Sequence, residues 1–377
     1  MKILLINFME TTYPGGINKA VREIANNLSK NHEVTVLQSN PFNLSSEENY
    51  EEFNIIRVSS WLEKYTYGLN PEFAIYLKKH FHELNPDIIH IHGYTTLFSI
   101  EAIHIIKKMN KKAPIILSPH YSIFSRNTFA GKYFSGIYNQ LIGKRSIKKA
   151  DIIIASSNFE ADNLKKYLNV PEEKIKIITH GINNFNPVHN KKKEGLINLL
   201  YVGYLLELKG VQYILEAMNE LINKKKVPVC LRIVGEGPYR DKLKKIADEL
   251  DLNEFIIWEG FIQNSNMEKL LEYYKKADIL LLLSQSENYG IVVIESLAMG
   301  TPAIVTKRTA LKEFLDEPGC FGVEYPPNPK VVADLILEIY KTDVNVGPLS
   351  EKIRTWCQVV KEYENLYIDV LKDKERI

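Results

Sequence analysis

The sequence predicts an α/β fold of two tandem Rossmann-like, doubly wound domains with a cleft between them. Short apolar segments alternate with amphipathic helical segments, which is typical of parallel sheets covered by helices on both faces. The alternation stops at a polar stretch with one proline, residues 183–194, and then resumes. The length of 377 residues also suits two domains. We therefore predict a first domain at residues 1–182, a linker at 183–196 and a second domain at 197–350.

The first domain begins with an apolar strand at residues 2–8, and a helix follows in which Ile17, Ala20 and Ile24 recur at helical spacing. Further strands are expected at residues 33–37, 54–58, 87–91, 114–117, 151–155 and 176–178. Helices are expected at residues 72–84, 99–109, 132–149 and 159–168. This order predicts a parallel sheet that presents the carboxyl ends of its strands to ligands.

The second domain repeats the alternation. Its strands are expected at residues 198–202, 229–234, 255–258, 279–283, 303–305 and 322–325. The last helical segment, residues 353–371, carries Trp356, Tyr363 and Tyr367 on one stripe. Such a stripe predicts that the helix packs against another part of the protein.

Composition excludes several classes of protein. The chain has 48 basic and 46 acidic residues, a net charge of +2, which argues against a dedicated nucleic-acid binder. Its three cysteines are far apart and lack a C-x-x-C pair, so neither a disulfide framework nor a thiolate metal site is indicated. No apolar run approaches the roughly 18 residues of a membrane-spanning helix, and residues 1–8 lack the features of a signal peptide. We therefore expect a cytoplasmic protein.

The most informative stretch is residues 286–306, which reads as polar loop, glycine, amphipathic helix, Gly-Thr-Pro and apolar strand. Glu287 precedes Gly290 on the loop, and Glu295 lies about one turn into the helix. The N–H groups at the helix start, together with the helix dipole, favour a phosphate. Carboxylates accept hydrogen bonds from vicinal hydroxyls. A loop with both features suits a sugar nucleotide.

The stretch from Glu287 to Glu295 resembles the E-x7-E signature of retaining family 4 glycosyltransferases, and Gly300-Thr-Pro302 resembles the Gly-x-Pro that follows it there. The resemblance extends over nearly the whole chain and implies the GT-B fold, in which the final helix, here within residues 351–377, returns to the N-terminal domain. It implies that Glu287 contacts the donor sugar and Glu295 the ribose. The same loop is expected to bind the donor through Asn288, Tyr289, Gly290 and Ile291.

Three features of the first domain point to ligands. Gly15 and Gly16 join the first strand to the first helix, where glycines allow close backbone approach; they resemble the family's donor-facing Gly-Gly loop, although a plain turn is the alternative. His90 and His92 end a strand with both imidazoles on one face, as a polar lining of the cleft or as metal ligands without an identified third partner. His120 ends the next strand and resembles the family's acceptor-side histidine; a merely hydrogen-bonded histidine is the alternative.

The second domain carries two further landmarks. Gly203, Tyr204 and Lys209 lie in a segment that resembles the family's Gly-Arg-Leu-x-x-x-Lys-Gly. The resemblance implies that Lys209 binds the diphosphate and offsets charge on the departing nucleotide. Tyr204 stands where the family has arginine, so one positive charge is missing. Gly235, in a Gly-Glu-Gly sequence, resembles the landmark at which a strand turns into a helix beside the base.

These residues imply a retaining glycosyltransferase that moves a hexose-type sugar from a UDP- or GDP-sugar to an unidentified acceptor, which is a sugar or glycan, a lipid-linked molecule or a small molecule. His120, Lys209 and Glu287 are its expected catalytic residues. No cofactor and no metal are expected, because no Asp-x-Asp pair ends a strand. A non-catalytic sugar-nucleotide-binding protein and a nucleotide-sugar epimerase are the alternatives.

Residues 132–149 combine aromatic and basic side chains, a composition that can rest on an anionic membrane surface. This predicts peripheral contact with the inner face of the cell membrane. A solvated helix packed by its aromatic side is the alternative.

Overall fold

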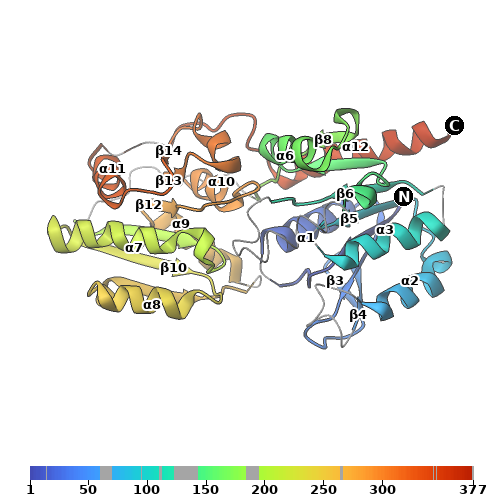
Figure 1. Cartoon of the computed structure of the whole chain (residues 1–377), viewed down its shortest axis with the longest axis horizontal. Coiled ribbons are helices and arrows are strands. Elements are labelled where there is room, and N and C mark those ends of the chain that lie inside the picture. Colours follow the sequence, from blue (N-terminus) through green and yellow to red (C-terminus); the bar gives the residue numbers. More distant parts are fainter. Residues whose placement is uncertain are drawn as a thin grey trace. The chain divides into compact units, whose positions relative to one another are not determined.

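The structure is a computed structural model that describes residues 1–13, 15–59, 70–94, 96–109, 113–122, 143–183, 195–263, 266–342, 344 and 346–375. The chain divides into two compact units (Figure 1). Unit 1 comprises Met1–Gly181 and Trp356–Ile377, and unit 2 comprises Ile182–Thr355. Each unit contains one sheet with helices packed on it, which confirms the predicted pair of Rossmann-like α/β domains.

The described part of unit 1 forms one sheet in the order β3-β4-β2-β1-β5-β6-β7-β8. Its strands are β1 (Lys2–Asn7), β2 (Glu33–Ser39), β3 (Glu47–Tyr50), β4 (Phe53–Val58), β5 (Ile88–His92), β6 (Ile115–Ser118), β7 (Ile152–Ala155) and β8 (Ile175–Ile177). Neighbouring strands pair in parallel except at the edge, where β3 pairs antiparallel with β4.

Helices cover both faces of this sheet because side chains alternate along its central strand. Ile3 and Leu5 of β1 point to a core shared with α1 and α12, whereas Leu4 and Ile6 point to a core shared with α2 and α3. The helices are α1 (Gly16–Leu28), α2 (Pro71–Leu84), α3 (Leu97–Met109), α5 (Lys144–Ile147), α6 (Asn158–Leu168) and α12 (Trp356–Glu375), with the 3-10 turn η2 (Glu172–Lys174).

The C-terminal helix α12 lies beside α1 within unit 1 (Figure 1). Its side chains Trp356, Val359, Tyr363 and Tyr367 are buried in the core that α12 shares with α1, here called the α1 core. These residues include the apolar stripe predicted for the last helix.

Unit 2 forms a parallel sheet in the order β11-β10-β9-β12-β13-β14. Its strands are β9 (Ile197–Val202), β10 (Val229–Val234), β11 (Ile256–Gly260), β12 (Ile279–Leu282), β13 (Ala303–Thr306) and β14 (Cys320–Val323). Its α-helices are α7 (Val211–Asn219), α8 (Arg240–Glu249), α9 (Met267–Lys276), α10 (Ile291–Ala298) and α11 (Pro329–Thr342). Shorter turns are η3 (Glu207–Lys209), the π-helical η4 (Glu220–Lys224), η5 (Asn253–Phe255) and η7 (Thr309–Phe314).

Most predicted elements that lie in the described residues are confirmed to within two residues, and two differ. The last helix, expected at residues 353–371, is Trp356–Glu375, and β3 was not predicted at all. Most of the helix predicted at residues 132–149, including its aromatic residues, and most of the predicted linker lie outside the described residues; the short helix α5 falls in the described part of the former.

Candidate functional site

The donor residues predicted in unit 2 lie on the loops that follow β9, β10 and β12. These strands are neighbours and parallel, so the three loops lie at one edge of the sheet. The loops after β9 and β10 are bonded main chain to main chain: Gly203 N donates to Val234 O at 3.0 Å, and Leu205 N donates to Glu236 O at 2.8 Å. A Cβ on Gly235, whose φ is 145°, would lie 1.9 Å from Gly203 O, so no larger residue fits.

Lys209 and Glu287 form an ion pair, with 2.6 Å between Nζ and Oε1. Lys209 ends η3 after β9, and Glu287 lies on the loop between β12 and α10. Their side chains are only 21% and 13% exposed. Opposite charges in a partly desolvated setting attract each other more strongly than the same charges in open water. The structure therefore brings two predicted catalytic residues into direct contact.

Glu287 is fixed by residues that sequence reasoning missed. Ser284 Oγ donates to Glu287 Oε1 at 2.9 Å, and Glu287 N donates to Thr309 Oγ1 at 3.2 Å. Thr309 is buried and has φ 58°, which is unusual for a β-branched residue. A loop serine and a threonine at the start of η7 carry no sequence signal for this role, and Thr309 lies 22 residues from Glu287 in the chain.

The N-terminus of α10 presents main chain rather than side chains. Its N-cap is Gly290, with φ 104° and no side-chain cap. Tyr289 and Ile291 bury their side chains, and the Tyr289 ring packs edge-on to Phe314 with centroids 5.2 Å apart. Asn288 is half-buried in the same loop. The first N–H groups of a helix lack partners within it and favour an anion.

Glu295 lies further along α10 and is buried. Its Oε2 accepts a hydrogen bond from Tyr274 Oη at 2.8 Å. Burial, and then the charge of Glu295, raises the pKa of Tyr274 well above its usual value, so the tyrosine stays a donor. A contact of Glu295 with ribose remains a prediction.

Tyr204, which replaces the family arginine, is 58% exposed. Its main-chain oxygen accepts a hydrogen bond from the Tyr201 hydroxyl at 3.2 Å. Tyr201 is fully buried, and burial followed by the charge of Glu287 raises its pKa well above its usual value. A different side chain therefore has room at position 204.

In unit 1, Gly15 and Gly16 lie between β1 and α1, with Gly15 as the N-cap of α1 at φ 139°. The loop before them is held by a buried ion pair in which Arg57 Nε lies 2.7 Å from Glu10 Oε2. Gln38 Nε2 also donates to Glu10 Oε2 at 2.7 Å. Burial alone would raise the pKa of Glu10, but hydrogen bonds from Arg57 and Thr12 lower it below its usual value.

Four histidines line up at the carboxyl ends of the unit 1 strands. The rings of His90 and His92 lie 4.1 Å apart, those of His92 and His120 5.6 Å, and those of His120 and His180 6.2 Å. His90 bonds the Tyr367 hydroxyl at 2.7 Å and Ser118 Oγ at 2.8 Å. The two imidazoles predicted on one strand face are therefore side by side, but both are buried.

His120 has φ 50°, a left-handed conformation that is uncommon for residues other than glycine. The next residue, Tyr121, donates its N–H to Glu160 Oε1 at 2.6 Å, and Ser156 donates to the other oxygen of the same buried carboxylate. His92 Nδ1 lies 3.3 Å from His120 Nε2. These contacts fix both the backbone and the ring of His120.

Burial makes these histidines weak bases. It lowers the pKa of His90 and of His180 to about 3 and that of His120 to about 4. Among the described residues, no group of three or more His, Cys, Asp and Glu side chains is placed to hold a metal ion. No helix within the described ranges is long and apolar enough to cross a membrane.

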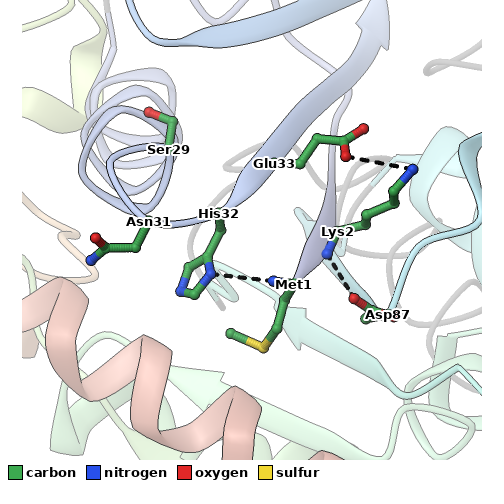
Figure 2. Close-up of a pocket in the computed structure, with 7 residues that line it drawn as sticks. All are labelled: Met1, Lys2, Ser29, Asn31, His32, Glu33 and Asp87. Carbon is green, nitrogen blue, oxygen red and sulfur yellow. Dashed lines mark hydrogen bonds and ion pairs between the residues drawn. The ribbon is translucent and has the colours of Figure 1, made fainter.

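A surface pocket lies at the amino ends of β1 and β2, whereas the histidines lie at the carboxyl ends of the strands (Figure 2). There Lys2 N donates to Asp87 Oδ2 at 2.7 Å, and Lys2 Nζ lies 3.5 Å from Glu33. The pocket is lined by Met1, Lys2, Ser29, Asn31, His32, Glu33 and Asp87. None of the predicted site residues belongs to it.

Solved structures share this fold. Sucrose-phosphate synthase from Thermosynechococcus elongatus matches with a TM-score of 0.83 at 19% identity, covering 98% of this chain and 99% of that chain. HepE of Anabaena in complex with UDP and glucose matches with a TM-score of 0.73 at 15% identity, covering 97% and 99%. Two Rossmann-like domains of this kind define a GT-B protein.

Sequence comparison assigns the family. Residues 183–355 match the family model described as glycosyl transferases group 1, and residues 14–184 match that described as glycosyltransferase family 4. Together the matches span residues 14–355, and the chain belongs to the group 1 glycosyltransferases, which makes it a transferase.

Curated relatives align over most of the chain. An uncharacterized glycosyltransferase of Methanocaldococcus jannaschii is 26% identical over 97% of this chain and 98% of its own length. The alpha-monoglucosyldiacylglycerol synthase of Streptococcus pneumoniae is 27% identical over 92% and 80%. The N-acetyl-alpha-D-glucosaminyl L-malate synthase of Bacillus anthracis is 23% identical over 96% and 97%.

Proposed function

We propose that this glycosyltransferase transfers a hexose-type sugar from a UDP- or GDP-sugar to its acceptor with retention of anomeric configuration. The observation that carries the proposal is the meeting of Lys209 and Glu287 on the sheet edge that also bears the N-terminus of α10. A cation and helical N–H groups suit a diphosphate, whereas a carboxylate suits sugar hydroxyls. The E-x7-E spacing from Glu287 to Glu295 and the family's retaining character support the same mechanism.

In the proposed reaction, the bond between the anomeric carbon and the diphosphate oxygen breaks, and its electron pair stays on that oxygen. Lys209 and the N-terminus of α10 stabilise the charge that develops there. The acceptor hydroxyl forms the new bond on the same face of the sugar, and its proton passes to the departing diphosphate oxygen. Glu287 holds the sugar through its hydroxyls, and Glu295 holds the ribose.

His120 is the proposed contact to the transferred sugar or the acceptor. Its left-handed backbone is held by Glu160, and its ring by His92. Because its pKa is lowered to about 4, the imidazole is neutral at pH 7 and can donate or accept a hydrogen bond.

A lipid acceptor is favoured by one relative. The pneumococcal relative is named for the synthesis of a glucosyl diacylglycerol, and it aligns over 92% of this chain. A lipid acceptor would place a cytoplasmic enzyme at the inner face of the membrane. Transfer assays with diacylglycerol, glucosyl diacylglycerol and malate as acceptors test this, and transfer to malate alone would contradict it.

We also propose that turnover needs no divalent metal, because Lys209 and the helix N-terminus already offer positive potential to the diphosphate. Activity should survive a chelator. Complete loss in chelator, restored by magnesium or manganese, would overturn this part of the proposal.

The donor proposal is tested by incubating the protein with UDP- and GDP-sugars and following slow donor hydrolysis and transfer. The anomeric configuration of the product, read by NMR, tests retention. Binding without turnover of any donor would favour the non-catalytic alternative, and conversion of one nucleotide sugar into another would favour an epimerase. An inverted product would contradict the retaining mechanism.

A further inference from the structure

We propose that the Lys209–Glu287 ion pair makes the site discriminate the intact sugar nucleotide from the bare nucleoside diphosphate left after transfer. The inference rests on the proposed function, which gives Lys209 to the diphosphate and Glu287 to the donor sugar. The structure adds that these side chains are already each other's partners, 2.6 Å apart. A ligand that binds one of these side chains therefore takes away the partner of the other.

Both members of the pair are held in place from their main chains. On the lysine side, Gln285 N donates to Leu208 O at 2.7 Å, and a Cβ on Gly210 would lie 2.0 Å from Leu283 O. On the glutamate side, Ser284 Oγ and Thr309 Oγ1 fix the carboxylate and the backbone of Glu287. Because both loops are anchored, the main chains of Lys209 and Glu287 keep their places when a ligand arrives, and only the side chains can change partners.

A bare nucleoside diphosphate faces a cost at this pair. If its phosphate draws Lys209 away, Glu287 keeps a negative charge without its cation, in a position only 13% exposed. An ionised group that loses its partner while partly buried is unfavourable. The same carboxylate also repels the anionic phosphate.

An intact sugar nucleotide avoids this cost. Its sugar hydroxyls donate to Glu287 while its diphosphate engages Lys209, so both charges exchange one partner for another. Once the sugar has been transferred, that compensation is lost and the ion pair can re-form. The ion pair thus favours binding of the donor and release of the product.

The experiment measures the affinities of UDP, GDP, UDP-glucose and GDP-mannose for the full chain by titration calorimetry. Of UDP and GDP, the one that the wild type binds should bind about tenfold more tightly to Glu287→Gln. In this variant the charged contact from Glu287 no longer competes with the phosphate for Lys209. Affinity for the matching sugar nucleotide should stay level or fall. Glu287→Ala, which removes the same charge, should give the same tightening, and melting curves check that both variants are folded.

Two variants serve as matched controls. Ser284→Ala keeps the charge of Glu287, so the ratio of the two affinities should stay near the wild-type ratio. Glu295→Gln removes a charge that is bonded to Tyr274 rather than to Lys209, and it should weaken both ligands alike.

Unchanged or weaker binding of the bare nucleotide in both Glu287 variants would overturn the inference even if the donor binds and turns over. Equal tightening in Glu295→Gln would overturn it as well, because general charge removal would then explain the result. If the wild type binds neither nucleotides nor nucleotide sugars, the proposed donor function itself fails, and the inference fails with it.

Discussion

At the scale of single residues, the site combines side chains that a pattern identifies with others that only folding brings in. Lys209 and Glu287 were predicted from spacing and resemblance, and the fold pairs them. Ser284 and Thr309 were not predicted, since hydroxyl side chains are common in loops and their bonds to Glu287 depend on how η7 packs. Sequence patterns therefore identify charged and glycine positions better than the residues that hold them.

Tyr204→Arg should raise donor affinity or turnover. A charged contact to phosphate contributes roughly 1.5 to 3 kcal/mol, which corresponds to about one to two powers of ten in rate or affinity. Tyr204 is 58% exposed, so an arginine has room beside the loop. Steady-state kinetics with the preferred donor measure the effect, and Tyr204→Phe is the size-matched control.

Lys209→Ala should abolish activity for the complementary reason, because it removes the cation that is proposed to bind the diphosphate of the leaving group. Unchanged activity in Tyr204→Arg together with substantial activity in Lys209→Ala would show that other groups hold the phosphate.

At the scale of elements, hydrophobic periodicity predicts apolar strands and misses a polar one. β7 and β12 are apolar runs and were found in the sequence. β3 is the polar segment Glu47–Tyr50 at the antiparallel sheet edge, and its formation depends on pairing with β4. The buried Arg57 on β4 was likewise hidden, because a lone arginine in a strand pattern suggests an exposed face.

Arg57→Met should destabilise unit 1 by about 3 to 5 kcal/mol, since it leaves Glu10 charged and unpaired in the interior. The side chains of both residues are 0% exposed. The double change Glu10→Gln with Arg57→Met should recover part of the loss. Urea denaturation measures both, and a loss below about 1 kcal/mol in the single variant, a value typical of exposed pairs, would contradict a buried, coupled pair.

The four histidines at the carboxyl ends of the unit 1 strands predict that unit 1 becomes less stable in acid. Burial lowers the pKa of His90 to about 3, below the roughly 6.5 of an unfolded chain. Between these values the unfolded state binds the extra proton, so stability falls as pH falls below about 6.5. At pH 5 the loss is about 2 kcal/mol for one such histidine.

Hydrogen exchange as a function of pH measures this effect in each unit. His90→Gln, which can keep the hydrogen bonds to Tyr367 and Ser118 without titrating, should give a shallower pH dependence. Unit 2 is the internal control, because eight of the nine histidines of the chain lie in unit 1. An equal pH slope in both units would contradict the assignment.

At the scale of the whole molecule, the two units differ in how the chain builds them. Unit 2 is one continuous segment, and its ends are tied together: Ile182 N donates to Arg354 O at 2.9 Å, and Ile182 bridges Thr355. Unit 1 is discontinuous, because α12 returns from beyond unit 2. The sequence alone predicts that this last helix is packed, but not against which helix, since a stripe of apolar residues does not specify its partner.

This difference predicts that residues 182–355 fold alone and bind the donor nucleotide, whereas residues 1–181 do not fold. The fragment 182–355 keeps its own core and the Lys209–Glu287 pair. The fragment 1–181 lacks the five α12 side chains that are buried in the α1 core, each contributing roughly 1.5 to 3 kcal/mol. Their sum is comparable with the whole stability of a domain, about 5 to 15 kcal/mol. In the fragment 1–181, the buried His90 also lacks its hydrogen bond to the Tyr367 hydroxyl.

Adding a peptide of residues 356–377 to residues 1–181 should restore cooperative unfolding, because it returns the missing face of the α1 core. Circular dichroism melting curves follow the folding of each fragment, and calorimetry follows nucleotide binding to residues 182–355. A cooperative transition in residues 1–181 without the peptide would show that the α1 core tolerates the loss of α12. Failure of residues 182–355 to fold would show that unit 2 depends on unit 1 despite its continuous core.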